Sequence, residues 1–347
     1  MKISRSLKIA IPIIAGVAAI AAAVPVVNLY RDKKAAGFDS SVELYVRETT
    51  PPDAVEDSLK AHARWPRRIH RILKKESAGA PFKPGHYTVE RSSTVTFAAR
   101  MLTHGWQTPV KLTLSGSLRR KGDIAKKISM QMMADSSSIA AALDDEELLA
   151  GLGVTPATAF ALFIPDTYQF YWTETPEAIL GRMKEAADAF WTKDNLRKAS
   201  DLNLTRMEVT TLASIVTGET RIAEDMPKIA GVYLNRLKRG MKLQACPTVA
   251  YCFDYKPSRI LNKHLQVKSP YNTYTHTGLP PGPICSPSKE ALTAVLNPDL
   301  GGGALFFCAD PAFNGRHRFA RTFAEHSRNA REYQKALANR KRQARSH

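Results

Sequence analysis

The hydrophobic positions of this chain begin with one long apolar run near the N-terminus. Residues 9–30 contain no charged side chain, and basic residues lie on both sides of the run. A helix of this length, at about 1.5 Å per residue, crosses a hydrocarbon core of roughly 30 Å. The run is also rich in Ala, so a cleaved secretory signal is the alternative. We favour a retained anchor because the run is long for a signal, and either interpretation places most of the chain outside the cytoplasm.

Shorter apolar patterns follow the anchor. Residues 37–77 are charged and helical in character, most clearly at 43–47 and 61–75, and they predict a spacer. Residues 84–135 alternate short apolar strands with short helices, which is typical of a small β/α module. We expect Asp123 to cap the last helix of this module, because an Asp side chain accepts hydrogen bonds from the free N–H groups of a helix start.

Two helices with clear start signals lie in the second half of the chain. Thr205 and Glu208 predict a capping box at the start of the first helix. The second opens at Asp225, which we expect to cap it, carries Pro227 in its first turn and closes at Gly240. With the apolar strands, these helices predict an α+β fold. Its predicted divisions are a cytoplasmic tip with a transmembrane anchor (1–34), a helical spacer (35–83), the small module (84–135), a larger mixed helix and strand domain (136–338) and a basic tail (339–347).

The net charge narrows the possible partners. The 347 residues include 50 Lys and Arg against 32 Asp and Glu, which gives a formal net charge of +18. Such a surface favours nucleic acid, acidic lipid headgroups or anionic polymers. Because most of the chain lies outside the cytoplasm, we do not expect a nucleic-acid partner. The basic tail is most simply a solvated helix end, with contact to acidic lipid headgroups as the alternative.

Cysteine and histidine positions argue against a metal centre. The cysteines show no repeated C-x-x-C spacing, and His317 and His326 lie nine residues apart without a third ligand nearby. We therefore expect neither a metal nor another cofactor. In an oxidising compartment one or two disulfides could form, and the sequence leaves both disulfides and four separate buried thiols open. The four cysteines are Cys246, Cys252, Cys285 and Cys308.

Glu219 is the candidate catalytic residue that the helical pattern singles out. It follows Leu212, Ile215 and Val216 at spacings of i, i+3, i+4 and i+7, so the carboxylate lies at the C-terminal end of a buried stripe. Burial, the negative end of the helix macrodipole and the scarcity of basic groups on that face all favour the neutral acid. A Glu that stays protonated near neutral pH suits a general acid. The alternative is a solvated glutamate at a frayed helix end.

Two later segments suit the recognition of a sugar. Residues 244–251 and the run SPYNTYTHTGLPPGPI at 269–284 combine amides, hydroxyls and rings. Sugar hydroxyls hydrogen-bond to amides and hydroxyls, and the apolar face of a sugar ring stacks on aromatic side chains. The same segments could equally be ordered loops with satisfied hydrogen bonds. Asn235 and Arg236 lie off the apolar stripe of their helix, so by themselves they are expected to be surface polar residues.

Several long strings resemble the YceG-like endolytic murein transglycosylases. The resemblance spans most of the chain and implies a single membrane helix, a LysM-like module at 84–135 and a catalytic domain at 136–338. It also implies a location in a Gram-negative-type inner membrane, with the catalytic domain in the periplasm. The strings are FIPDTYQF (163–170), TLASIVTGET (211–220), VYLNRLKRGMKLQACPTVAY (232–251), SPYNTYTHTGLPPGPICSPS (269–288) and HRFARTFAEHSRNAREY (317–333).

The resemblance implies a reaction with a single catalytic carboxylate. The family cuts the glycan strand of peptidoglycan internally and leaves a 1,6-anhydro-muramyl end. Glu219 matches the family's essential Glu, whereas Thr217, Gly218 and Cys246 depart from charged residues of the family's pattern. A lone Glu suits this reaction, because the muramyl C6 hydroxyl attacks intramolecularly and replaces a second carboxylate.

We predict that Glu219 acts first as general acid and then as general base. The predicted partners are peptidoglycan glycan strands, the membrane and penicillin-binding protein synthases. The alternatives are an inactive glycan-binding scaffold of the cell-wall synthesis machinery and a hydrolase that admits water. The predicted substrate-binding residues are Asn235 and Gln244 as hydrogen-bond partners, Arg236 as partner of a substrate carboxylate, and Tyr271, Asn272 and Tyr274 as cleft residues.

Overall fold

The computed structural model describes residues 5–116 and 118–343, which divide into two compact units. The first four residues of the predicted cytoplasmic tip and the last four of the predicted basic tail lie outside the described residues. The first unit holds the chain up to Lys111 together with Gln131–Met133 and Gln169–Glu174, and the second unit holds the remainder. Helices and small two-stranded sheets occur in both, which confirms the predicted α+β class.

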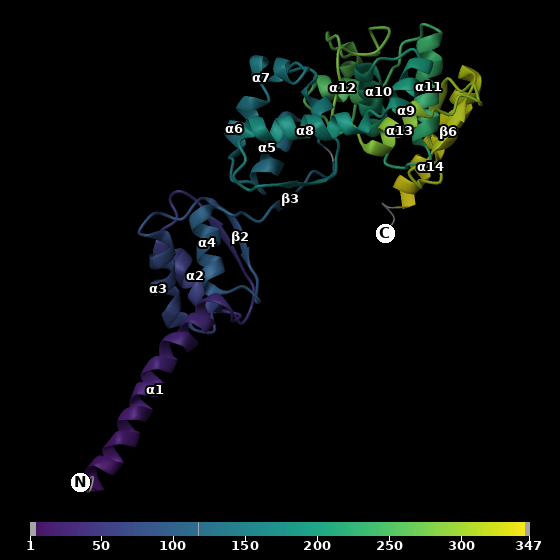
Figure 1. Cartoon of the computed structure of the whole chain (residues 1–347). Helices are drawn as coiled ribbons and strands as arrows, with labels where there is room; N and C mark the ends of the chain where they lie inside the picture. The colour runs from purple at the N-terminus through teal and green to yellow at the C-terminus, as the bar shows by residue number, and fades with distance from the viewer. Residues whose placement is uncertain (1–4, 117, 344–347) are drawn as a thin grey trace. The chain divides into compact units, whose positions relative to one another are not determined.

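The first unit begins with one continuous helix, α1 (Arg5–Lys33), shown in purple in Figure 1. Its segment Ile14–Lys33 has a mean hydropathy of 1.6, and among the described residues α1 is the one helix long and apolar enough to cross a membrane. Length and composition suit a single-pass anchor and a signal sequence alike. Arg68 fastens the end of α1 to the rest of the unit, because its guanidinium donates to Asp32 at 2.7 Å and to Asn28 at 2.6 Å.

A two-stranded antiparallel sheet forms one side of the core of the first unit. Strand β1 (Val42–Val46) pairs with β2 (Gly85–Val89), and Leu44 lies opposite Tyr87. Buried and exposed residues alternate along β1, as in a half-buried strand. The helix predicted at 43–47 is therefore wrong. The strand's alternating pattern is only five residues long and its partner comes two helices later. The sheet also joins residues on both sides of the predicted boundary at residue 84.

Three helices cover this sheet and complete an apolar core. They are α2 (Pro52–His62), α3 (Pro66–Ser77) and α4 (Val95–His104). Tyr87 is fully buried among them and donates its hydroxyl proton to the Lys83 carbonyl at 2.7 Å.

A second small sheet pairs β3 (Val110–Thr113) with β4 (Thr167–Phe170).

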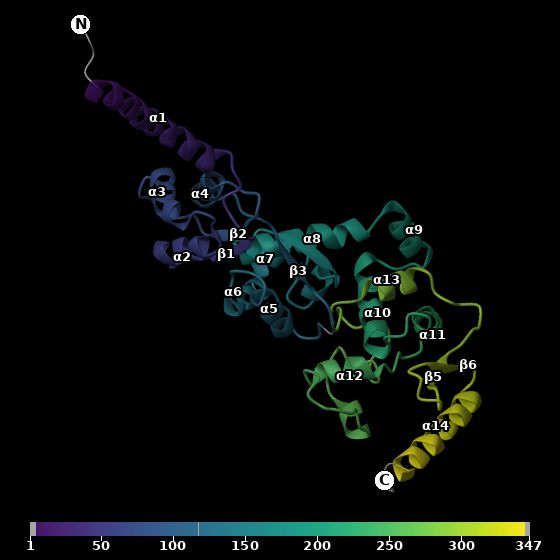
Figure 2. The same cartoon turned by 90° about the horizontal axis from the view of Figure 1, so that it is seen from below.

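The second unit is mainly helical (Figure 2). Its elements before the candidate site are α5 (Lys121–Ser129), α6 (Ser136–Ala142), α7 (Glu146–Gly151), η1 (Ala159–Leu162), α8 (Pro176–Phe190) and α9 (Lys193–Asp201). Its later elements are α10 (Arg206–Glu219), α11 (Met226–Lys238), α12 (Cys246–Cys252), η2 (Asn262–Gln266), α13 (Lys289–Leu296), β5 (Phe306–Ala309), β6 (His317–Ala320) and α14 (Phe323–Gln343).

Helix α10 forms the centre of the core of the second unit (Figure 2). Residues 209–216 are all buried, and the helix contacts α11, α12 and α13. The predicted capping box is confirmed at its start. The Thr205 hydroxyl accepts a hydrogen bond from the Glu208 N–H at 3.2 Å, and the Glu208 carboxylate accepts one from the Thr205 N–H at 2.8 Å. The packing and the cap fix the direction of α10, so its last residue, Glu219, has a defined position.

Neither of the two aspartates predicted as caps caps its helix with its side chain. Asp123 lies inside α5, and its carboxylate pairs with Arg120 at 3.1 Å. Asp225 occupies the position before α11, but its carboxylate makes no capping hydrogen bond. It accepts bonds from the backbone N–H and Nδ1 of His317 instead, at 2.8 and 3.0 Å. The bond to β6 joins the start of α11 to a segment 92 residues later, a contact that sequence spacing does not reveal.

The C-terminal part of the second unit pairs β5 with β6 and packs α14 on both strands (Figure 2). Phe307 of β5 lies opposite Phe319 of β6 in the antiparallel register. Strand β5 also contacts α11. The pair therefore brings aromatic side chains to the helix that follows Glu219 in the chain.

Candidate active site

Glu219 ends α10 and lines two cavities. Thr220, the next residue, has an extended backbone, so the helix stops there. The Glu219 side chain is half-buried and lines a cavity of about 540 Å³ and a second cavity of about 380 Å³. A carboxylate shared by two cavities can meet a long substrate near its middle.

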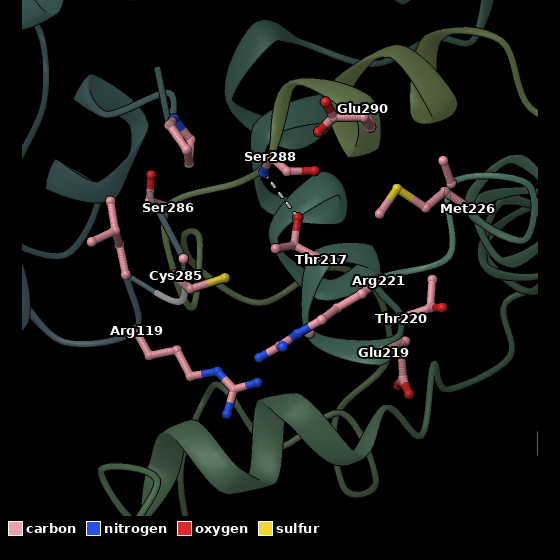
Figure 3. Close-up of a pocket in the computed structure, with 15 residues that line it drawn as sticks. Arg119, Thr217, Glu219, Thr220, Arg221, Met226, Cys285, Ser286, Ser288 and Glu290 are labelled. Carbon is pink, nitrogen blue, oxygen red and sulfur yellow. Dashed lines mark hydrogen bonds between the residues drawn. The ribbon is translucent and has the colours of Figure 1, made fainter. Parts of the chain in front are cut away.

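The larger cavity, which we call the arginine cavity, contains two guanidinium groups (Figure 3). Its lining includes Arg119, Arg221, Ser286, Ser288 and Glu290 in addition to Glu219. Figure 3 shows Glu290 on the opposite side of the cavity from Arg119, Arg221 and Glu219. The two carboxylates of this cavity are therefore not a pair.

The smaller cavity, which we call the aromatic cavity, is lined by rings. Tyr233, Tyr274, Phe306 and His326 lie around it with Glu219. Phe306 stacks on His326 with ring centroids 5.4 Å apart. Rings at a cavity wall suit the apolar face of a sugar.

The environment of Glu219 favours its neutral form near neutral pH. Burial of the carboxylate raises the pKa of Glu219 to about 7, and the hydrogen bond from Tyr233 opposes this rise. The Tyr233 hydroxyl donates to Oε1 of Glu219 at 2.7 Å. A carboxylic acid with this pKa can donate a proton and then accept one at the same pH.

Tyr233 is a functional residue that the sequence pattern missed. It lies on the apolar stripe of α11, so the periodicity predicts an ordinary core residue. In the structure Tyr233 is only 2% exposed. Its ring packs edge-on against Phe307 with the ring centroids 5.8 Å apart, and its hydroxyl bonds to Glu219. Burial and the neighbouring Glu219 raise the pKa of Tyr233 well above its usual value, so the hydroxyl stays a donor. The signal in the sequence that could have identified Tyr233 is its place on α11, the helix that follows Glu219 in the chain.

Thr217 and Gly218 have structural roles beside Glu219. The Thr217 hydroxyl accepts a hydrogen bond from the Ser288 N–H at 3.0 Å, which ties the start of α13 to α10 (Figure 3). A Cβ atom built on Gly218 would lie 2.7 Å from the Pro247 Cβ. A side chain at residue 218 would therefore push α12 away from α10. These two departures from the family's pattern fit the local packing.

Arg236 is predicted as a surface residue and is buried instead, at 7% exposed. Its guanidinium donates to backbone carbonyls of Leu305 at 2.6 Å and Leu243 at 2.9 Å, and it lies over the Phe306 ring at 5.0 Å. Those bonds brace the wall of the aromatic cavity. Arg236, the predicted partner of a substrate carboxylate, therefore already bonds to backbone carbonyls of the protein.

Two of the predicted hydrogen-bonding residues lie close to Arg236. Gln244 lines the aromatic cavity and accepts a bond from Arg236 at 3.2 Å through Oε1. Its φ of 52° is left-handed, a conformation that a residue other than Gly rarely adopts. Asn235 is half-buried and donates to the Ala304 carbonyl at 3.1 Å.

The three residues predicted in the 269–284 loop separate. Tyr274 lines the aromatic cavity with its hydroxyl 3.2 Å from the Cys246 sulfur. Asn272 is fully buried, and its amide donates to the Leu265 and Val267 carbonyls at 3.0 and 2.8 Å, so it braces the loop. Tyr271 packs against Tyr251 with ring centroids 4.6 Å apart and is not among the residues that line either cavity.

The remaining candidates for metal or redox chemistry lie apart. No cluster of three or more possible metal ligands occurs within the part of the chain that the structure describes. His317 is held by Asp225, and His326 lies in the aromatic cavity, where burial and the charge of Arg236 lower its pKa. All four cysteines are free thiols in the structure, and Cys285 is the buried one among them.

Comparison with known proteins identifies the family of this chain. The model of the YceG-like family matches residues 44–332. The endolytic murein transglycosylase of Bacillus subtilis (strain 168) is 29% identical over 278 residues, which cover 75% of each chain. The endolytic murein transglycosylase of Streptococcus pneumoniae (strain D39) is 32% identical over 180 residues, which cover 50% of this chain and only 32% of the relative.

A solved structure supports the fold. The 2.6 Å crystal structure of a YceG-like protein from Listeria monocytogenes superposes with a TM-score of 0.57. It is 24% identical, and the match covers 83% of this chain and 98% of that chain. Since the family model extends over most of the described residues and includes Glu219, this chain belongs to the YceG-like family.

Proposed function

We propose that this protein is an endolytic lytic transglycosylase of peptidoglycan, with Glu219 as its one catalytic carboxylate. The observation that carries the proposal is a carboxylic acid with a pKa of about 7 that lines two cavities. A cut inside a polymer requires space for the chain on both sides of the reacting bond. The two cavities that share Glu219 supply that space.

The first step is the transfer of a proton to the glycosidic oxygen. Glu219 in its neutral form donates the proton as the bond between the muramyl C1 and the leaving sugar oxygen breaks. Tyr233 occupies Oε1, so we place the transferred proton on Oε2. Tyr233 is a positioning residue, because it acts on the substrate only through Glu219.

The second step closes the anhydro ring. The muramyl C6 hydroxyl attacks C1 and gives its proton to the Glu219 carboxylate, which restores the neutral acid. Because the nucleophile belongs to the same sugar, the attack is intramolecular and has a high effective molarity. No water enters the product. A second carboxylate is not needed, which fits the position of Glu290 on the opposite side of the arginine cavity.

The surroundings of Glu219 suit the binding of a glycan. Tyr274 and Gln244 line the aromatic cavity and can contact the sugar directly. Asn235 and Arg236 hold the segment after α13 and the loop after α11 in place, and we assign them positioning roles. Asn272 and Tyr271 support the loop that carries Tyr274.

The rest of the chain gives the enzyme its place in the cell. We propose that α1 is a single-pass anchor in a bacterial inner membrane and that the rest of the first unit and the whole second unit lie in the periplasm. We also propose a LysM-like module between the anchor and the catalytic part. Penicillin-binding protein synthases are proposed as partners, because nascent glycan strands are made at the same membrane surface.

The experiment that tests this function compares Glu219→Gln with wild type on purified, uncrosslinked glycan strands. We expect release of anhydro-muropeptides to fall by about 100- to 10,000-fold, the range for loss of a general acid and base. Glu224→Gln is the matched control, since Glu224 is exposed and is not among the residues that line the two cavities. Equal product release by Glu219→Gln and wild type would remove Glu219 from the mechanism. Absence of product with all three proteins would favour the scaffold alternative.

A further inference from the structure

The arginine cavity holds two positive charges that the reaction at Glu219 does not use. Arg119 and Arg221 both line it, and Figure 3 shows their guanidinium groups extending into it. Within the described residues neither side chain has a carboxylate partner or a hydrogen bond. Arg119 has one contact with a ring, 5.2 Å from the centroid of Tyr255.

Arg119 is half-buried and Arg221 is exposed, and both line the same cavity, where an anion can balance their two positive charges. Each planar guanidinium can form two parallel hydrogen bonds with a carboxylate. Glu290 is the other ionisable acid of this cavity, and it lies on the side away from both arginines. Glu219 is neutral below its pKa of about 7 and adds no full negative charge there. The cavity therefore has a net attraction for an anionic group.

The other polar groups of the cavity are occupied by the chain. The Ser286 hydroxyl donates to the Phe163 carbonyl, and the Thr217 hydroxyl donates to the Ala213 carbonyl at 2.8 Å. The Thr220 hydroxyl accepts a bond from the Ile222 N–H at 3.0 Å. The arginines are thus the main donors left for a ligand.

The chemistry of the substrate supplies a suitable anion close to Glu219. The muramyl sugar whose C1 reacts carries its lactyl group and stem peptide on the same ring, and the stem peptide bears free carboxylates. Because Glu219 lines both cavities, each cavity is within reach of a peptide that extends from a sugar held at Glu219. Of the two cavities, the aromatic one has its single arginine, Arg236, already bonded to backbone carbonyls.

We propose that Arg119 and Arg221 bind a carboxylate of the stem peptide and so select strands whose peptides retain free carboxylates. This inference rests on the proposed function, because it assigns the arginine cavity to the peptide of the sugar that is cut. Arg119 and Arg221 then act as specificity residues, and they do not take part in proton transfer.

The test compares one set of glycan strands before and after the peptide carboxylates are converted to primary amides. Amidation keeps the peptide and removes its charge. We expect wild type to favour the unmodified strands by about tenfold or more in kcat/KM, mainly through KM, because a charge-assisted bond is lost. Arg119→Gln and Arg221→Gln should each reduce this preference toward one. Arg119→Lys should keep part of it, since Lys keeps the charge but lacks the planar fork.

Arg239→Gln is the matched control, because Arg239 is an exposed arginine of the same unit and is not among the residues that line the arginine cavity. It should keep the wild-type preference. Equal kcat/KM of wild type on both sets of strands would overturn the proposal, and so would an unchanged preference in Arg119→Gln and Arg221→Gln. A wild-type protein that forms no anhydro ends from either set would instead reject the proposed function. Thermal unfolding of each variant shows whether a loss of the preference for unmodified strands comes from misfolding. If Arg119→Gln misfolds, the preference of Arg119→Lys decides whether Arg119 selects the peptide carboxylate.

Discussion

The Tyr233 hydroxyl donates a 2.7 Å hydrogen bond to Oε1 of Glu219, across the gap between α11 and α10. This bond fixes the orientation of the carboxyl group and stabilises its charged form, while burial stabilises the neutral form. The balance leaves the pKa of Glu219 at about 7. Substitutions that change either effect should therefore change how the activity of the enzyme depends on pH.

Tyr233→Phe removes the hydrogen bond and keeps the ring. Because the bond lowers the pKa of Glu219, its loss should raise that pKa further. The neutral acid would then persist to higher pH, so the alkaline limb of the kcat/KM profile should move upward. We expect kcat to fall about tenfold at the optimum, since the carboxyl group is less well oriented. Tyr171→Phe, at an exposed tyrosine of the first unit, is the control. An unshifted alkaline limb in Tyr233→Phe would contradict the positioning role.

Glu219→Gln should stabilise the fold at high pH. The pKa of Glu219 is about 7 in the folded protein against an ordinary value of 4.5, so the folded state binds the proton more tightly than the unfolded state. Ionisation of the folded protein is then costly. The cost is absent below pH 4.5 and grows until the pH passes about 7. Because the Glu219 side chain is partly exposed and its charge is screened by solvent, we expect the free energy of unfolding of Glu219→Gln to exceed that of wild type by about 1 to 2 kcal/mol at about pH 8. Urea unfolding of both proteins at about pH 4 and about pH 8 measures it. A gain of equal size at both pH values would contradict the assigned cause.

Glu290→Gln should leave the cleavage reaction largely intact. A hydrolase with two carboxylates would lose most of its rate when the second is removed. Glu290 lies away from Glu219, and the proposed mechanism gives it no part in proton transfer. We expect less than about a threefold change in kcat on peptidoglycan strands. A loss comparable to that of Glu219→Gln would instead indicate two acting carboxylates.

Asp225→Ala should destabilise the second unit without a direct effect on proton transfer. Asp225 is 3% exposed and accepts two hydrogen bonds from His317, and their loss leaves buried donors unpaired. The expected cost is about 2 to 4 kcal/mol in the free energy of unfolding. Glu224→Ala, at the exposed neighbouring position, should cost less than about 0.5 kcal/mol. Equal unfolding midpoints for the two variants would show that the bond to β6 adds nothing.

The parts of the site that come from one helix could be predicted from the sequence. The capping box at Thr205 and Glu208 and the buried stripe Leu212, Ile215 and Val216 are local features, and they place Glu219 at the buried end of α10. Period and capping depend only on neighbours within one or two turns. Those signals therefore survive without knowledge of the fold.

The parts that depend on distant segments could not be predicted in this way. Arg236 is off the stripe of α11, yet it is buried because the Leu305 carbonyl meets it from a segment 69 residues later. Tyr233 fits the stripe, and the apolar pattern does not reveal what its hydroxyl meets. Strand β1 was missed because its partner β2 lies beyond two helices. In each case the deciding contact is made with a segment far away in the sequence. The hydrophobic pattern of a single element cannot predict such a contact.

The second step proposed at Glu219, closure of the anhydro ring, requires attack on C1 by the C6 hydroxyl of the muramyl sugar rather than by water. The most direct test digests uncrosslinked glycan strands in water enriched in oxygen-18 and analyses the new ends by mass spectrometry. We expect anhydro-muramyl ends that are one water lighter than reducing ends and carry no oxygen-18. Reducing muramyl ends that contain oxygen-18 would contradict the proposed mechanism.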